Sequence, residues 1–211
     1  MSTQQTFRII TLQVGEYGNN SYILIDPLTL KSGLIDAAAD AEKIIEQLRD
    51  TDLQFILTTH SHQDHWGALS ELKAKFPDAK IGAHKLDSSG LPEPVDLNLN
   101  HGDTLLIGNI PLRVIHTPGH TDGSLCFVTG DYLFTGDTLF PGGPGHSTSP
   151  EALSREIESI VNNLYVLDRN INILPGHGPT TTIKDSMMEY KLYAARDHTK
   201  DLYGDILWNE K

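Results

Sequence analysis

The chain has 211 residues, and 38% of them are hydrophobic, which is enough to bury one large core and too many for a disordered protein. Acidic residues number 28 and basic residues 16, so the formal net charge is −12. This balance argues against a nucleic-acid partner, whose phosphate backbone requires a basic surface. We predict a single domain over residues 1–211, with an oligomeric state that the sequence leaves open.

The N-terminal sequence MSTQQTFRII has no basic region followed by an apolar stretch, which is the pattern of a signal peptide. No segment reaches the roughly 18 consecutive apolar residues of a membrane-spanning helix. Cys126 is the only cysteine, so an intramolecular disulfide cannot form. These features predict a cytoplasmic protein without membrane contact.

In the first half of the chain, short segments of β-branched and aromatic residues alternate with turn residues. GEYGNN joins the first two of these segments as a hairpin-like loop. An amphipathic helix follows, because Ile44, Ile45 and Leu48 share one side of it. The elements predicted in this half are strands at 7–14, 20–26, 33–38, 53–59 and 81–85 and helices at 40–50 and 66–77.

The second half again places a block of strands before helices. Ser149 is a suitable N-cap for a long helix that has Pro150 at its first position. The elements predicted in this half are strands at 103–108, 110–117, 124–130, 131–136 and 170–176 and helices at 149–167 and 183–208. This order indicates an α/β protein with two packed sheets and helices on their outer faces, and a doubly wound single sheet is the alternative.

Potential metal ligands gather where predicted strands end. The segment TTHSHQDHWGA, residues 58–68, directly follows an apolar strand, and three later strands also end close to a histidine or an aspartate. Imidazole nitrogens and carboxylate oxygens suit zinc and other first-row divalent ions. The seven candidate ligands are His60, His62, Asp64, His65, His120, Asp137 and His177.

The combination of HSHQDH at 60–65, PGH at 118–120, TGD at 135–137 and PGHG at 175–178 resembles the metallo-β-lactamase superfamily, specifically its glyoxalase II-like hydrolases. The resemblance implies an αββα four-layer sandwich with metals in a cleft at one edge of the two sheets. It also implies a first ion held by three histidines, a second ion held by two histidines and an aspartate, and an aspartate that bridges both. These sets are His60, His62 and His120, then Asp64, His65 and His177, then Asp137 as the bridge.

The expected chemistry is hydrolysis of a small-molecule substrate with two divalent ions, by default Zn²⁺, with iron and manganese as alternatives. Two ions about 3.5 Å apart can hold a bridging hydroxide, which would attack a carbonyl carbon. Asp64 would then act catalytically, because it would both bind an ion and orient the nucleophile. A thioester is favoured as substrate, since a thiol with a pKa near 8.5 leaves without a strong general acid.

Other activities of the same superfamily remain as alternatives. Lactonases and other ester hydrolases share the bridging aspartate and are the main rivals. A β-lactamase is disfavoured by Asp137 and by the missing signal peptide. An iron-dependent persulfide dioxygenase would use fewer of the ligands, and a nuclease is disfavoured by the charge.

Substrate-binding residues are expected in the loops that flank the ligands. The candidates are Tyr17, Asn19, Asn20 and His146. After TGDTLF no basic residue occurs before Arg155, so the anchors that glutathione often uses in this family are missing and another thiol carrier is open. Asp36 is a candidate for a hydrogen bond to the ligand-bearing loop. The remaining histidines, at 84, 101, 116 and 198, are interpreted as structural or surface residues.

Overall fold

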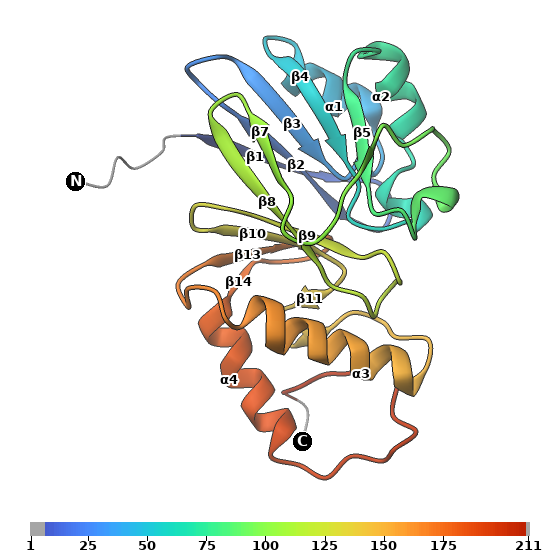
Figure 1. Cartoon of the computed structure of the whole chain (residues 1–211), viewed down its shortest axis with the longest axis vertical. Helices are drawn as coiled ribbons and strands as arrows, with labels where there is room; N and C mark the ends of the chain where they lie inside the picture. Colours follow the sequence, from blue (N-terminus) through green and yellow to red (C-terminus); the bar gives the residue numbers. More distant parts are fainter. Residues whose placement is uncertain (1–6, 210–211) are drawn as a thin grey trace, which may run out of the picture.

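Two six-stranded sheets pack face to face in the computed structural model, which describes residues 7–209 (Figure 1). The first sheet has the strand order β1 (Arg8–Val14), β2 (Asn19–Ile25), β3 (Lys31–Ile35), β4 (Asp52–Leu57), β5 (Lys80–Ala83) and β6 (Leu97–Asn98). The second has the order β14 (Thr181–Thr182), β13 (Asn172–Pro175), β10 (Tyr132–Gly136), β9 (Leu125–Thr129), β8 (Ile110–His116) and β7 (Thr104–Ile107). A small ribbon pairs β11 (Leu139–Phe140) with β12 (Gly143–Pro144).

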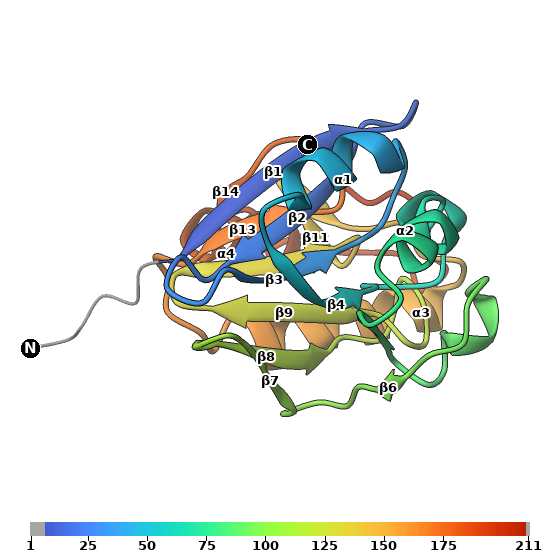
Figure 2. The ribbon, with the colours of Figure 1, turned by 90° about the horizontal axis from the view of Figure 1, so that it is seen from above.

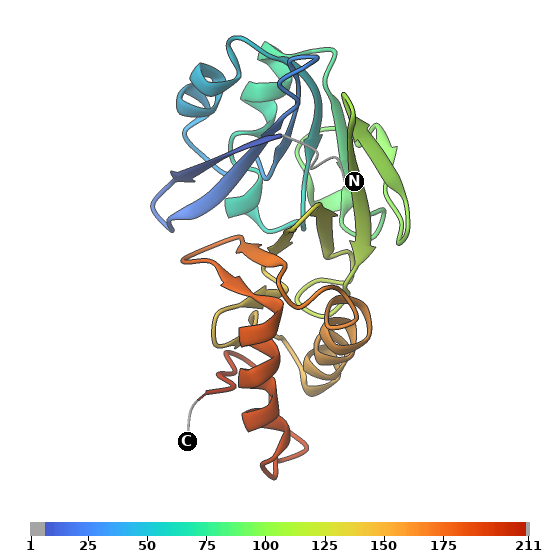
Figure 3. The same ribbon diagram turned by 90° about the vertical axis from the view of Figure 1, so that its left-hand side faces the viewer.

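Helices cover the outer face of each sheet. The helices are α1 (Ala41–Leu48), α2 (Leu69–Lys75), α3 (Pro150–Ser159) and α4 (Ile183–Ala194), with the short helical turns η1 (Gln63–His65), η2 (Ser88–Gly90) and η3 (Ile160–Leu164). Strands β3, β4 and β5 are parallel, so the chain must cross over between them, and α1 and α2 are these crossovers. Figure 2 shows α1 and α2 beside the first sheet, and Figure 3 shows α3 and α4 beyond the second.

The pattern of buried side chains explains why the central strands are apolar along their whole length. In β2, Tyr22 and Leu24 face the core between the sheets, whereas Ile23 and Ile25 face α1 and α2. Strand β9 alternates in the same way, because Phe127 enters the core between the sheets and Cys126 faces the α3–α4 layer. A strand buried on both faces needs no polar side. The predicted αββα sandwich is confirmed.

The predicted helix over 183–208 is wrong beyond Ala194, where α4 ends. The chain then turns back irregularly, so that Gly204 pairs with Ser147 and the Trp208 side chain is fully buried among the Tyr165, Tyr190 and Tyr193 rings. The apolar residues of this tail therefore dock the segment after it reverses, and they do not continue one helical face. The short strands β6, β11, β12 and β14 were not predicted, because two-residue strands carry no periodic signal. Within residues 7–209, the structure contains no helix with the length and apolarity needed to cross a bilayer.

Candidate metal centre

Strand direction brings the ligand-bearing loops to one edge of the second sheet. Strand β9 is antiparallel to both β8 and β10, and β10 is parallel to β13. The chain therefore leaves β8, β10 and β13 at the same edge, and the loops that follow carry His120, Asp137 and His177. The loop after β4 of the facing sheet adds His60, His62, Asp64 and His65. All seven predicted ligand residues thus meet in overlapping groups.

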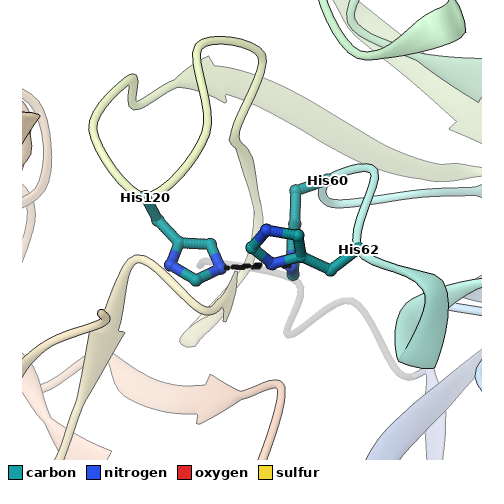
Figure 4. Close-up of side chains that lie close together, drawn as sticks. All are labelled: His60, His62 and His120. Carbon is teal, nitrogen blue, oxygen red and sulfur yellow. Dashed lines mark hydrogen bonds between the residues drawn. The ribbon is translucent and has the colours of Figure 1, made fainter. Parts of the chain in front are cut away.

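Three imidazole rings form the first group, and Figure 4 shows them converging from two loops. His62 Nδ1 lies 3.0 Å from His60 Nε2 and 2.9 Å from His120 Nε2. The Nε2 atoms of His60 and His120 are 3.3 Å apart. Three ring nitrogens directed at one point form one face of a tetrahedral metal site.

The second group consists of Asp64, His65 and His177. His177 Nε2 lies 3.2 Å from both His65 Nε2 and Asp64 Oδ2. The Asp137 carboxylate lies between the two groups, with Oδ1 3.3 Å from His65 Nε2 and Oδ2 3.8 Å from His120 Nε2. This placement allows Asp137 to contact ions in both groups.

The approach of Asp137 to the second group requires a glycine before His177. A Cβ atom added to Gly176 would lie 2.3 Å from Asp137 Oδ1 and 2.6 Å from His65 Cε1. Both distances are far below van der Waals contact. Gly176 is therefore required for the close packing of the centre.

The outer nitrogens of the histidines are held by acceptors. Nδ1 of His65 lies 2.9 Å from Asp36 Oδ2, Nδ1 of His120 lies 2.9 Å from the His146 carbonyl, and Nδ1 of His177 lies 3.2 Å from the Tyr17 carbonyl. Since carbonyl and carboxylate oxygens only accept, each Nδ1 carries a hydrogen, so Nε2 is the atom of each ring that can bind an ion.

A centre made of lone pairs and carboxylates requires positive charge. Asp137 Oδ1 is buried and has no hydrogen-bond partner among the described residues. Burial opposes a charge on His65, yet Asp36 and Asp137 raise the pKa of this histidine to about 10. Burial and the neighbouring imidazoles lower the pKa of His60 well below its usual value, which keeps its nitrogen available as a ligand. The donor set therefore fits divalent cations, which would replace the proton on His65.

Asp36 ties the ligand-bearing loop to the end of β3, as expected. Its carboxylate accepts hydrogen bonds from the Thr59 backbone N–H and the Thr59 hydroxyl, both at 2.8 Å, in addition to the one from His65. Asp36 adopts a positive φ of 58°, a conformation that aspartate tolerates better than most residues. This conformation turns the side chain under the loop.

Asp87 was not identified from the sequence, although it connects the two loops that carry the three-histidine group. Its Oδ2 accepts from the Ser61 backbone N–H at 2.8 Å and from the Thr121 hydroxyl at 2.7 Å. Its Oδ1 accepts from the Gly123 backbone N–H at 2.9 Å. The sequence offered no signal for this role, because the three partners are between 26 and 36 residues away.

Replacing Asp87 by asparagine is expected to lower the affinity for the first ion about 10- to 100-fold. The amide NH₂ would face backbone N–H donors, so the loops at Ser61 and Gly123 would separate. Competition with a zinc-binding dye would measure the affinity, and Asp78→Asn at an exposed turn is the control. An affinity equal to that of Asp78→Asn would show that Asp87 does not position the ligands.

The predicted substrate-binding residues occupy different environments. Tyr17 is 77% exposed and lines a cavity together with Asn19, whose amide donates to Asp64 Oδ2 at 2.9 Å. Asn20 instead is buried, and its amide donates to the carbonyls of Pro175 and Gly178. Both its amide hydrogens are thereby used in holding the His177 loop, so we infer a positioning role in place of the expected substrate contact.

His146 contributes through its backbone. Its carbonyl accepts from His120 Nδ1, whereas its exposed ring lies 3.0 Å from Asp205 Oδ1 of the C-terminal tail. Two of the histidines interpreted as structural stack on each other, since the ring centroids of His84 and His116 are 4.0 Å apart. His198 stacks on Tyr193.

Glu156 of α3 is fully buried beside the loop that carries His120. Its Oε1 accepts from the Gly145 backbone N–H at 3.2 Å, and its Oε2 has no hydrogen-bond partner among the described residues. Burial raises the pKa of this carboxyl to about 9, so it is neutral at pH 7.

The free energy of unfolding should consequently fall as the pH rises from 4.5 towards 9. In that window the unfolded chain has lost the proton that the folded protein still binds on Glu156. In Glu156→Gln this titration is absent, so urea unfolding at several pH values should show a smaller decline. Parallel declines in both proteins would contradict the buried, neutral state of Glu156.

Comparison with known proteins agrees with this geometry. The family model of the metallo-beta-lactamase superfamily matches residues 14–202. A probable hydroxyacylglutathione hydrolase of Schizosaccharomyces pombe is 35% identical over 179 residues, which cover 80% of this chain and 67% of that protein. A probable polyketide biosynthesis zinc-dependent hydrolase of Bacillus velezensis, BaeB, is 31% identical over 168 residues, which cover 76% of this chain and 73% of that protein. The crystal structure of the BLEG-1 B3 metallo-beta-lactamase matches with a TM-score of 0.76 and 27% identity, covering 86% of this chain and 97% of that chain.

A four-layer sandwich with a histidine–aspartate cluster at the edge of its sheets defines a metallo-β-lactamase fold, and the chain belongs to the metallo-β-lactamase superfamily. Within that superfamily it is a hydrolase whose relatives include proteins of the glyoxalase II type. The resemblance inferred from the four motifs is therefore confirmed.

Proposed function

We propose that the protein hydrolyses a thioester with two divalent ions, most simply Zn²⁺, held by the seven clustered residues. The observation that carries the proposal is the position of Asp137, whose buried carboxylate lies between two ligand groups and has an oxygen without a hydrogen-bond partner among residues 7–209. A site for one ion held by three histidines would need neither a second ligand group nor a carboxylate between two groups. The zinc-dependent hydrolase named among the relatives supports the choice of metal.

When bound, the ions would supply a nucleophile at neutral pH and stabilise negative charge on the carbonyl oxygen of the substrate. The chain contributes the arrangement of their ligands. Asn19 donates to one oxygen of Asp64, which fixes the direction of that carboxylate. Asp64 thereby has one oriented oxygen at the second group, where it would direct the nucleophile towards the carbonyl carbon.

The leaving group favours a thioester over an oxygen ester or an amide. A thiol has a pKa near 8.5 and departs as a thiolate without protonation. The carboxyl groups of the centre are ionised. Burial opposes the charge on Asp137, but the surrounding histidines lower the pKa of this carboxyl. Burial also opposes the charge on Asp64, whose pKa is lowered in part by the hydrogen bond from Asn19. These groups therefore have no proton to give to an alkoxide or an amine.

The test is the release of free thiol from the lactoyl thioesters of glutathione and of N-acetylcysteamine by zinc-loaded protein, with the metal content measured in the same samples. We expect hydrolysis that requires about two ions per chain and disappears after chelation. A lactone and a β-lactam in parallel assays distinguish the other hydrolases of the superfamily, and oxygen uptake with a persulfide distinguishes a dioxygenase. Metal-loaded protein that hydrolyses a lactone or a β-lactam but no thioester would overturn the proposal.

A further inference from the structure

A cavity of about 740 Å³ opens beside the second ligand group. It lies between the β1–β2 loop, the segment that precedes α1 and the start of the η1 turn. Asp64 is part of its wall, so a ligand at the metal centre can extend directly into this space. The side chains that determine its chemistry are Glu16, Tyr17, Asn19, Asp40, Gln63 and Asp64.

The size of the cavity indicates which half of a thioester enters it. Pockets of roughly 300–1,000 Å³ accommodate ligands of the size of a drug or a cofactor. An acyl group of a few carbons would leave most of the volume empty. In a substrate with such a short acyl group the thiol carrier is the larger half, and it is the half that fits.

The charge of the cavity disfavours a carrier with carboxylates. Three of its wall residues are acidic, and among the described residues no lysine or arginine lines it. The nearby Lys43 is engaged in an ion pair with Asp40. Glutathione carries two carboxylates and one ammonium group, so its net charge is −1. Asp64 would bind an ion and Asp40 pairs with Lys43, which leaves Glu16 as the wall carboxylate that would repel this charge. Like charges in a partly enclosed site repel each other more strongly than in bulk water.

The remaining wall groups suit a neutral chain that contains amides. Tyr17 offers an exposed ring against which an extended chain can lie, and Gln63 offers an amide that both donates and accepts. We propose that the thiol carrier of the natural substrate is an uncharged, amide-containing thiol of the pantetheine type, and that Glu16 excludes carboxylate-bearing thiols. This inference rests on the proposed thioester hydrolysis.

The experiment compares one acyl group, lactoyl, on glutathione, pantetheine and N-acetylcysteamine, with zinc-loaded protein. We expect kcat/KM to be at least about tenfold higher for the two uncharged carriers than for glutathione. In Glu16→Lys the ratio of kcat/KM for the glutathione thioester to that for the N-acetylcysteamine thioester should rise about threefold to tenfold, and the rise should shrink at high ionic strength. Glu158→Lys on the exposed side of α3 changes the net charge equally and should leave this ratio as in the wild type.

Two results would overturn the inference while leaving thioester hydrolysis in place. One is a kcat/KM for the glutathione thioester that equals or exceeds those for the uncharged carriers. The other is an equal ratio in Glu16→Lys and Glu158→Lys, since specificity would then not depend on the charge in this cavity. A failure of all three thioesters with metal-loaded protein would overturn the proposed function itself, and the inference with it.

Discussion

Asp137→Ala is expected to lower kcat/KM for a thioester by about a thousandfold or more, which corresponds to about 4 kcal/mol of transition-state stabilisation. The carboxylate lies between the two ligand groups, so its loss removes a ligand from both ions at once. The loss of this carboxylate also removes the negative charge near His65 and His120 that would offset the repulsion between the two cations. Metal analysis after dialysis should show fewer than two ions per chain.

Two control variants separate this effect from general damage. Asp131→Ala changes an exposed aspartate at the turn before β10, the strand that ends directly before Asp137. His198→Ala changes a histidine that stacks on Tyr193, far along the chain. Both should retain most of the activity and the full metal content. If His198→Ala lost as much activity as Asp137→Ala, the assignment of the site would be wrong.

Asp36→Asn is expected to lower the free energy of unfolding by about 2–3 kcal/mol and the affinity for the second ion about 10- to 100-fold. Three donors, two from Thr59 and one from His65, meet the Asp36 carboxylate in a buried place. An asparagine side chain tolerates the positive φ but can accept with one atom only, and its NH₂ would face a donor. The backbone conformation is therefore preserved while the hydrogen bonds are lost.

Urea unfolding of the metal-free protein measures the stability change, and zinc titration of the folded protein measures the affinity. Asp50→Asn, at an exposed position after α1, is the matched control for the change from a carboxylate to an amide. Equal stability and equal zinc binding in the two variants would mean that Asp36 does not support the ligand loop.

The ligand set could be predicted from the sequence because each ligand lies in a short motif immediately after an apolar strand. His60, His62, Asp64 and His65 are four residues within a segment of six, so local spacing alone brings them together. His120, Asp137 and His177 come from distant segments, but each follows a strand and has a glycine directly before it. Strands that end at one sheet edge bring such residues into proximity without further information.

Asp87 and Glu156 could not be predicted in this way, because their roles depend on contacts between distant loops. Asp87 resembles any turn aspartate until the Ser61, Thr121 and Gly123 segments are placed around it. Glu156 lies in an amphipathic helix, where an exposed side chain is the usual expectation, yet it is buried against the Gly145 loop. Asn20, expected to contact substrate, lies in β2, and its buried amide donates to the carbonyls of Pro175 and Gly178.

The sequence by itself indicated the alternation of strand blocks with helices and the seven candidate ligands, because periodicity and motif spacing are local properties of the chain. Tertiary structure alone decided where α4 ends, how the tail carries Trp208 back into the aromatic cluster and which charges line the cavity beside Asp64. The same apolar residues can lie on one helical face or dock an irregular segment, and the packing of the α3–α4 layer selects between them. Likewise, Glu16 and Asp40 are separated from Asp64 by many residues, and only the folded chain places the three carboxylates around one cavity.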